Sequence, residues 1–191
     1  ATQLGPDAAA EALDALLSRP GTPDRLWFLA SRFYVDQQHL DGARDAFEVL
    51  LSRRPGDPDL LLSLGLIAMQ QEDLPAAADY LERLRARNDH QDAAAFYLGE
   101  VYQGLGRARD ALAAYEAVRE GPEFTAALAR WADLMREEGA LGDVRVRLGD
   151  LRGTLPDLAV LITLIEANVL VRAEAVADAV ALLDDALAAN P

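Results

Sequence analysis

Residues 24–57 read DRLWFLASRFYVDQQHLDGARDAFEVLLSRRPGD, and the spacing of their large and small residues decides the fold. Trp27 and Tyr34 stand seven residues apart, so they lie two turns apart on one face of a helix. Ala43 and Phe47 stand four apart, so they lie one turn apart on a second helix. The stretch therefore predicts two helices joined by a turn.

The same residue types return along the chain about every 34 residues. The matching positions of the later copies are Leu61, Ala68, Ala77 and Leu81, then Ala95, Tyr102, Ala111 and Tyr115, then Leu128, Met135, Val144 and Leu148, and finally Thr163, Leu170, Ala179 and Leu183. Five copies in phase predict an all-α superhelix of stacked helix-turn-helix units, in which each unit covers the apolar face of its neighbour.

Small residues fall where the helices of a unit are expected to cross closely. They are Gly65 and Gly99 on first helices and Ala43, Ala77, Ala111 and Ala179 on second helices. This pattern resembles the tetratricopeptide repeat, which implies a right-handed α-α solenoid. The resemblance places one domain over residues 1–191, with a partial repeat 1–23 and repeats 24–57, 58–91, 92–124, 125–159 and 160–191.

Both ends of the sequence fall within or at the edge of a repeat, as expected for a fragment. It opens without Met in mid-repeat and closes on Pro191 at the end of a repeat, with no polar capping helix after it. Solenoids need such caps, because the last repeat otherwise exposes a face meant for a neighbour. We expect a fragment of a longer protein, with any signal peptide or lipid anchor outside it. Self-association through the uncapped ends is a second expectation.

The charge and composition of the chain limit the classes of partner that it can bind. The net charge is −14 and all 18 basic residues are Arg. Such acidity disfavours nucleic acid and anionic lipid, and either a halophilic source or selection for a basic ligand explains it. The absence of cysteine excludes disulfides and thiolate-bound zinc. The apolar stretch 158–171 is too short to span a bilayer, so we expect a buried first helix there and no transmembrane segment.

No motif for catalysis, metal or cofactor emerges. His39 and His90 fall in predicted turns, and neither has a second His at metal-ligand spacing. Residues 104–107 resemble a fragment of a phosphate loop, but no strand precedes them, and glycine in a turn supplies a positive φ. We expect a non-catalytic protein; an enzyme would lose turnover or metal uptake when His39 or His90 is replaced.

The resemblance also implies where a ligand binds. In the tetratricopeptide family the first helices line a concave groove, with contacts at the second, fifth, ninth, twelfth and thirteenth places of a repeat. Here those places hold Arg25, Phe28, Arg32, Val35 and Asp36; Asp59, Leu62, Leu66, Met69 and Gln70; Ala93, Phe96, Glu100, Gln103 and Gly104; Ala126, Ala129, Asp133, Arg136 and Glu137; and Leu161, Leu164, Asn168, Val171 and Arg172. With no Lys and a single Asn among them, the carboxylate clamp of the chaperone-binding members is missing.

The first three repeats carry the candidate groove. Its predicted residues are an apolar strip, Phe28, Leu62, Leu66, Met69 and Phe96, flanked by the charged residues Arg25, Arg32 and Glu100. A strip of this kind is typical of a surface that binds a protein or peptide. The alternative is that these side chains pack between helices.

Three stretches give a closer likeness. Residues 57–71 (DPDLLLSLGLIAMQQ), 78–84 (ADYLERL) and 95–102 (AFYLGEVY), with the tail 179–191, are similar to the tetratricopeptide lipoproteins of the Gram-negative envelope. Members of that group include an adaptor for a carboxy-terminal processing protease. The likeness implies a bacterial adaptor on the periplasmic side of the outer membrane. A cytoplasmic assembly or chaperone scaffold and a self-associating module remain as alternatives.

Overall fold

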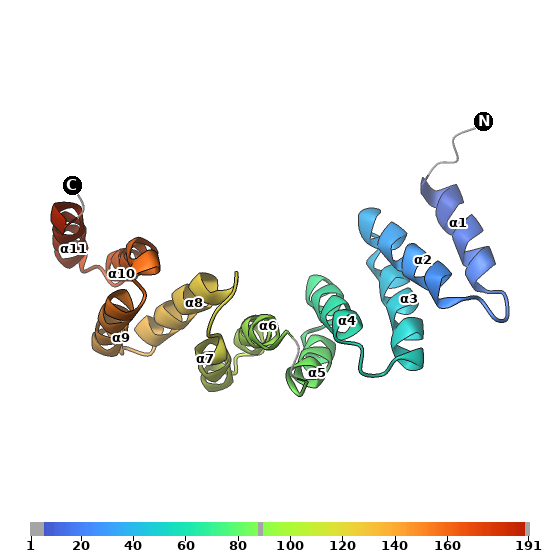
Figure 1. Cartoon of the computed structure of the whole chain (residues 1–191), viewed down its shortest axis with the longest axis horizontal. Coiled ribbons are helices and arrows are strands. Elements are labelled where there is room, and N and C mark those ends of the chain that lie inside the picture. The colour runs from blue at the N-terminus through green and yellow to red at the C-terminus, as the bar shows by residue number, and fades with distance from the viewer. Residues whose placement is uncertain (1–5, 88–89, 190–191) are drawn as a thin grey trace. The chain divides into compact units, whose positions relative to one another are not determined.

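The computed structural model describes residues 6–87 and 90–189, so the predicted end of the last repeat at Pro191 lies outside the described residues. Within that part the chain forms eleven α-helices, one short 3₁₀ helix and no strand, which confirms the predicted all-α fold (Figure 1). The helices are α1 (Pro6–Leu17), α2 (Asp24–Asp36), α3 (Leu40–Arg53), α4 (Pro58–Gln70), α5 (Leu74–Arg85), α6 (Gln91–Gly104), α7 (Ala108–Ala117), α8 (Phe124–Glu137), α9 (Leu141–Thr154), η1 (Pro156–Leu158), α10 (Ala159–Arg172) and α11 (Val176–Ala189).

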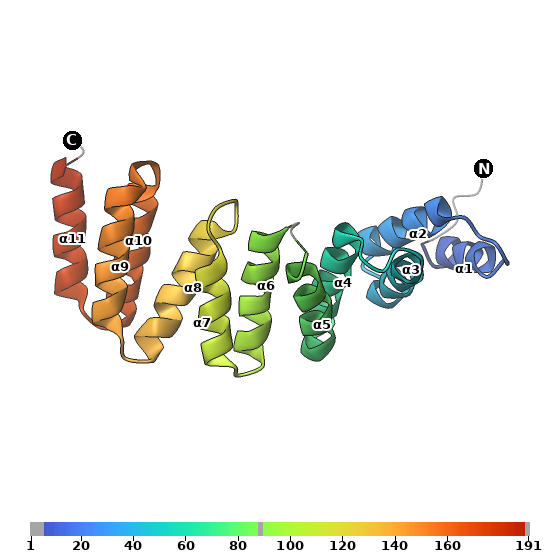
Figure 2. The same cartoon turned by 60° about the horizontal axis from the view of Figure 1, so that its bottom comes forward.

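The helices pack in consecutive pairs: α2 on α3, α4 on α5, and α10 on α11 (Figures 1 and 2). We call α2, α4, α6, α8 and α10 the first helices and their successors the second helices. The chain divides into two compact units, with the boundary inside α6 between Val101 and Tyr102. The first unit holds α1 to α5 and most of α6, and the second holds α7 to α11. The single domain over 1–191 stays a prediction.

The predicted close crossing is confirmed at Gly65, and the predicted alanines of the second helices are buried. A Cβ added to Gly65 on α4 would come within 2.8 Å of both Cγ and Cδ2 of Leu81 on α5. On the second helices, Ala43, Ala77 and Ala111 are fully buried, and Ala179 is 2% exposed. Glycine and alanine at these places let the backbones approach, because any larger side chain would push the paired helices apart.

The turn inside each pair repeats one backbone geometry. A backbone N–H closes each turn by donating to the carbonyl five residues earlier. Examples are His39 N to Tyr34 O at 2.8 Å and Asp73 N to Ala68 O at 2.9 Å. The residue before each of these donors takes a left-handed conformation, with φ between 57° and 79°; these residues are Gln38, Glu72, Gly106, Gly139 and Glu174. This is the Schellman end of a helix, and it returns at the repeat register. The positive φ predicted for glycine in the turn at 104–107 is confirmed at Gly106.

Three of the five turns place a residue with a Cβ where glycine is favoured. We expect Glu72→Gly to raise the free energy of unfolding by about 0.5–1 kcal/mol, because it removes backbone strain at φ 59°. Gly106→Ala is the matched reverse change, since a Cβ there meets nothing within 4 Å. It should destabilise by about 1 kcal/mol through the backbone alone. Urea unfolding measures both; destabilisation by Glu72→Gly would contradict the assignment.

Helix α1 joins the first unit through a buried phenol. Tyr34 on α2 is 2% exposed, and its hydroxyl donates a hydrogen bond to Asp14 Oδ1 on α1. Burial, and next the bond to the Asp14 carboxylate, raise the pKa of Tyr34 above its ordinary value near 10. Burial and a bond to Glu48 likewise raise the pKa of Tyr80.

These raised pKa values predict a loss of stability in alkali. Because the folded state holds the phenols neutral, their contribution is complete below about pH 10 and falls as the pH rises toward the folded-state pKa. The free energy of unfolding should therefore decline from about pH 10 upward. Tyr34→Phe should make the decline shallower, because one of these two phenols with a raised pKa is gone. Urea unfolding between about pH 8 and pH 11 tests this, and an unchanged slope in Tyr34→Phe would refute it.

A buried carboxylate marks the second unit. Glu166 on α10 is 2% exposed and pairs with two arginines of α9. Its Oε1 lies 3.4 Å from Arg145 Nε, and its Oε2 accepts a hydrogen bond from Arg152. The Nη1 atom of Arg145 also lies 3.0 Å from Oδ2 of Asp178 on α11. Both arginines therefore tie α9 to the helix that covers it.

Candidate functional site

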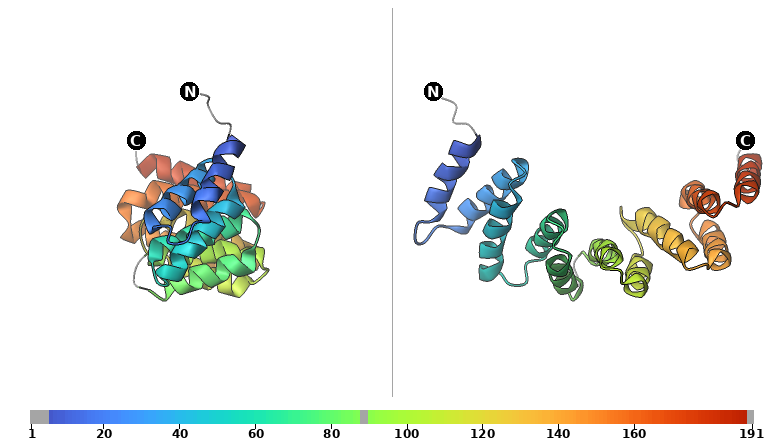
Figure 3. Two further views of the ribbon diagram at one scale, coloured as in Figure 1. Left: turned by 90° about the vertical axis from the view of Figure 1, so that its right-hand side faces the viewer. Right: turned by 180° about the vertical axis from the view of Figure 1, so that it is seen from behind.

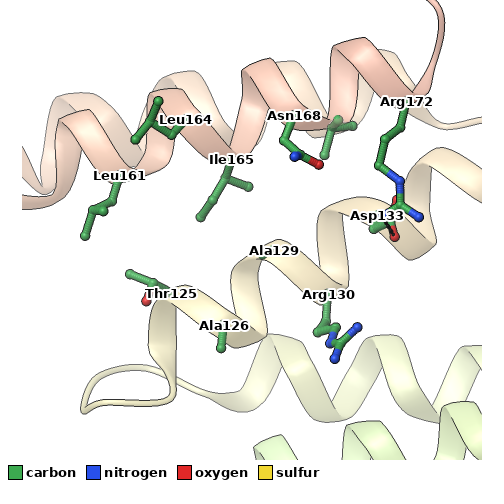
Figure 4. A pocket seen from close by; sticks show the side chains of 11 residues that line it. Thr125, Ala126, Ala129, Arg130, Asp133, Leu161, Leu164, Ile165, Asn168 and Arg172 are labelled. Carbon is green, nitrogen blue, oxygen red and sulfur yellow. Dashed lines mark hydrogen bonds and ion pairs between the residues drawn. The ribbon is translucent and has the colours of Figure 1, made fainter.

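Helices α8 and α10, the first helices of the last two pairs, pack against each other and leave a hollow of about 570 Å³ between them (Figure 4). Its lining is Thr125, Ala126, Ala129, Arg130 and Asp133 from α8, and Leu161, Leu164, Ile165, Asn168, Val169 and Arg172 from α10. Most of these residues occupy the ligand-contact places of the repeat register. Those at such places are Ala126, Ala129, Asp133, Leu161, Leu164, Asn168 and Arg172.

The hollow has an apolar end and a polar end. Leu161 lies at the apolar end, on the opposite side from Thr125 and Ala126 (Figure 4). Leu161 is 47% and Leu164 is 52% exposed, so their apolar surface is free to be buried by a ligand. Alanine at 126 and 129 supplies the space, because a larger side chain on α8 would fill it.

The polar end is closed by an ion-pair network. Arg172 donates to Asp133 across the hollow, and Asp133 lies 2.9 Å from Arg136 on its own helix. The carboxamide of Asn168 lies between this network and the leucines (Figure 4). It offers both a donor and an acceptor, which is what a peptide backbone requires. The site can therefore take an apolar side chain at one end and fix a polar backbone group at the other.

The first unit holds two further hollows between α2 and α4. One, of about 550 Å³, includes Arg25 and Phe28 in its lining, and the other, of about 290 Å³, includes Arg32 and Leu66. These four belong to the predicted groove. The remaining predicted residues, Leu62, Met69, Phe96 and Glu100, are half-buried on α4 and α6.

Helix α2 presents the most accessible part of this surface. Phe28 is 45% and its neighbour Leu29 is 60% exposed. Arg25 and Arg32 stand seven residues apart on the same helix face. Neither forms an ion pair with any of the described residues, although the hollow lined by Arg25 also contains Asp24, Asp57 and Asp59. Two free guanidinium groups therefore flank an exposed phenylalanine.

Sequence reasoning placed the candidate groove in the first three repeats and missed the α8–α10 hollow. The signal was present, because the register gives small residues on 126 and 129 opposite leucines on 161 and 164. Small residues on one first helix and large ones on the next leave space between them.

Both histidines make structural contacts. His39 Nδ1 accepts a hydrogen bond from Gly42 N at 3.1 Å, which caps α3. His90 Nε2 lies 3.1 Å from Asp59 Oδ1. In the described ranges, no three His, Asp or Glu side chains gather closely enough to hold a metal ion.

The apolar stretch 158–171 largely coincides with α10 (Ala159–Arg172), whose inner face is buried. No single helix within residues 6–87 and 90–189 is long and apolar enough to cross a membrane. Among the described helices, only α9 together with the segment Pro156–Arg172 reaches the required length and composition, and these two are bent by 119° at their break.

A family model of the tetratricopeptide repeat matches residues 2–58 and 62–123. The chain belongs to the tetratricopeptide repeat family.

Solved structures share its fold. A crystal structure of MamA is 16% identical with a TM-score of 0.67, covering 86% of this chain and 90% of its own. A tetratricopeptide repeat protein from Parabacteroides merdae ATCC 43184 is 16% identical with a TM-score of 0.66, covering 96% and 73%. YrrB, described as a TPR protein with an unusual peptide-binding site, is 17% identical with a TM-score of 0.62, covering 95% and 94%. No curated protein sequence matches the chain.

Proposed function

We propose that this protein is a non-catalytic interaction scaffold that binds a peptide or helix of a partner protein along its first helices. The observation that carries the proposal is the α8–α10 hollow, because most of the residues that line it occupy the ligand-contact places of the repeat. The peptide-binding site of YrrB, a protein of the same fold, supports a peptide as the ligand class.

In the second unit, the ligand buries an apolar side chain between Leu161, Leu164 and the alanines of α8. Each 100 Å² of apolar surface removed from water contributes about 2.5 kcal/mol before ordering costs. The ligand's backbone exchanges hydrogen bonds with Asn168 at the polar end. The Arg172–Asp133 pair sets the length of segment that fits, because it closes that end of the hollow.

In the first unit, the predicted groove residues bind a peptide segment of the same chemical class. Phe28 supplies the exposed apolar contact, and Leu62, Leu66, Met69 and Phe96 extend it on α4 and α6. Arg25 and Arg32 select a carboxylate on the ligand, because they carry no ion-pair partner among the described residues. Glu100 is the third charged residue of this strip, and together with the two arginines it selects the register in which the ligand binds.

Selection from a random peptide library displayed against the chain tests the proposal. We expect enriched peptides to combine large apolar residues with at least one Asp or Glu. Phe28→Ser should lower the affinity of peptides that bind the first unit by about tenfold, and the exposed Val146→Ser on α9 serves as the matched control. A library without enrichment, or peptides indifferent to all three hollows, would refute the peptide-scaffold proposal.

The finer proposal is a bacterial adaptor on the periplasmic side of the outer membrane that presents substrates to a carboxy-terminal processing protease. The likeness of residues 57–71, 78–84 and 95–102 to envelope lipoproteins of this family supports it. A pull-down with the intact protein from envelope extract should recover a protease or another envelope enzyme. Recovery of cytosolic partners alone would overturn it in favour of a cytoplasmic scaffold.

A further inference from the structure

Helices α1, α2 and α3 follow one another in the first unit and enclose a hollow of about 310 Å³ (Figures 1 and 3). We call it the α1–α3 hollow. Its lining is Asp14, Leu17 and Ser18 from α1, Trp27 and Tyr34 from α2, and Gly42, Asp45 and Ala46 from α3. It shares no residue with the two α2–α4 hollows, so it is a separate site of the first unit.

The α1–α3 hollow is acidic. Asp14 and Asp45 line it, and neither forms an ion pair within the part of the chain that the structure describes. The arginine next to Asp45 in sequence, Arg44, is bound by Glu48 and Asp73 instead. Burial, then the bond to Asp14, then the negative charges of Asp14 and Asp45 raise the pKa of Tyr34. Both carboxylates therefore lie close to the same hydroxyl, and together they favour a cation.

The indole of Trp27 adds an unused hydrogen-bond donor. Its Nε1 is buried and has no acceptor among the described residues. The other tryptophan of the chain, Trp131 on α8, donates to Glu116 Oε1 at 2.9 Å. Buried N–H groups in folded proteins are nearly always paired. A ligand that carries a carbonyl oxygen as well as a cation would satisfy Trp27.

The repeat register matches the hollow to places in later pairs. Its carboxylate on α1 is Asp14, and the equivalent residues one and three repeats later are Glu48 on α3 and Glu116 on α7. Its alanine on α3 is Ala46, three residues after Ala43, and the residues three after Ala77 and Val144 are Tyr80 on α5 and Arg147 on α9.

In both later groups the second helix supplies a partner for the carboxylate. The Tyr80 hydroxyl donates to Glu48 Oε1 at 2.8 Å. The Arg147 guanidinium donates to Glu116 Oε1 at 2.8 Å and lies over the Trp131 ring, 4.2 Å from its centroid. A guanidinium held between a carboxylate and an indole is therefore already present in the second unit.

The first unit has the same surroundings without the guanidinium. Ala46 has no polar group that reaches Asp14, and the α1–α3 hollow lies beside it. Arginine suits two carboxylates better than lysine does, because its planar guanidinium presents several donors and packs on aromatic rings. The net charge of −14 attracts a basic partner and disfavours a second copy of this chain.

We infer that the α1–α3 hollow binds an arginine side chain of a partner protein. Asp14 and Asp45 hold its guanidinium, as Glu116 holds Arg147, and a backbone carbonyl of the same segment accepts the hydrogen bond of Trp27. The chain then has a second contact for partners, independent of peptide binding between its first helices.

Blocked arginine, acetylated at its amino end and amidated at its carboxyl end, is the probe, because it keeps the peptide carbonyls and loses the terminal charges. Blocked citrulline, which has the same shape without the charge, is its control. Titration into the ¹⁵N-labelled chain is followed through the two indole N–H resonances. The Trp27 resonance should shift to saturation and that of Trp131 should stay. Citrulline should bind at least about tenfold more weakly, and blocked lysine should also bind more weakly.

Two variants remove the charges of the hollow. Asp14→Asn and Asp45→Asn should each weaken blocked arginine at least about fivefold, because each removes a charge and keeps the side-chain size. The carboxamide at 14 can still accept the hydrogen bond of the Tyr34 hydroxyl. Asp79→Asn is the matched control, since Asp79 on α5 is the register equivalent of Asp45 and is 66% exposed. It should leave the affinity unchanged.

A third variant fills the hollow. Ser18 is exposed and lines it, so Ser18→Phe should prevent the shift of the Trp27 resonance. Ser52→Phe is its control, because Ser52 is the exposed register equivalent on α3 and lies outside the hollow. Ala126→Trp, which fills the α8–α10 hollow, should have no effect. Failure here is therefore distinct from failure of the peptide scaffold.

Four results would overturn the inference. Equal affinities for blocked arginine and citrulline, or unchanged affinity in both Asp→Asn variants, would show that the cation is not recognised. Free arginine binding at least about tenfold more tightly than the blocked form would assign the hollow to the amino acid itself. A dimer in sedimentation that Asp45→Asn converts to a monomer would assign it to a second copy. A Trp27 resonance already at its bound position in the intact gene product would assign it to an arginine of the same protein.

Discussion

Leu81→Ala is expected to lower the free energy of unfolding by about 3 kcal/mol. Leu81 on α5 is fully buried, and its Cγ and Cδ2 fill the space above the backbone of Gly65 on α4. Truncation removes this contact and leaves a cavity at the crossing of the two helices. Urea unfolding followed by circular dichroism gives the change.

Gly65→Ala provides the partner change for a double-mutant cycle. Alone it should destabilise by about 1–3 kcal/mol, because the new Cβ would lie 2.8 Å from the Leu81 side chain. In the Leu81→Ala background the same methyl group enters the cavity, and alanine also favours the helix over glycine by about 1 kcal/mol. Gly65→Ala should therefore be neutral or stabilising there. Additive losses in the double variant would contradict the close crossing of α4 and α5.

Arg152→Met is expected to cost about 3 kcal/mol, because it leaves the buried carboxylate of Glu166 with the single guanidinium of Arg145. The Glu166 side chain is 3% exposed, so water cannot replace the lost partner. Arg83→Met is the matched control, since Arg83 and Asp79 pair at the surface with side chains 41% and 66% exposed. Its effect should stay within about 0.5 kcal/mol.

The double variant Arg152→Met/Glu166→Leu distinguishes the effect of losing the ion pair from the effect of losing the packing of the arginine side chain. With both charges removed, apolar contact between α9 and α10 should restore most of the stability lost in Arg152→Met. Thermal and urea unfolding of the three variants measures the recovery. If the double variant is as unstable as Arg152→Met, the loss arises from the arginine's packing and the buried-carboxylate explanation is wrong.

Periodicity predicts most of the fold because each repeat faces the same packing problem. The small residues at 65 and 77 could be assigned to helix crossings from spacing alone, and the structure places Gly65 against Leu81 and buries Ala77. The turn at 104–107 could be separated from a phosphate loop by its place in the register. The left-handed residues Gln38, Glu72 and Glu174 could not be predicted, because their side chains have no preference for that conformation.

The candidate site was predicted less completely for a physical reason. Register says which side chains share a face, but the depth of a hollow depends on how far two first helices lie apart. The predicted residues Arg25, Phe28, Arg32 and Leu66 line hollows, whereas Leu62 and Met69 are half-buried on α4. The burial of Glu166 could not be predicted for a similar reason. In the sequence it only interrupts an apolar stretch, and the two arginines that pair with it are known only from the structure.

The affinity of a library-selected peptide for Ala126→Trp tests the scaffold most directly. Ala126 is exposed and lines the α8–α10 hollow, and Ala113 on α7 is an equally exposed alanine outside it. Isothermal titration should show that Trp at 126 weakens binding by about a hundredfold, because the indole occupies the space for the ligand's apolar side chain, while Trp at 113 leaves affinity unchanged. Equal affinities of the two variants, with both folded, would contradict peptide binding in the hollow.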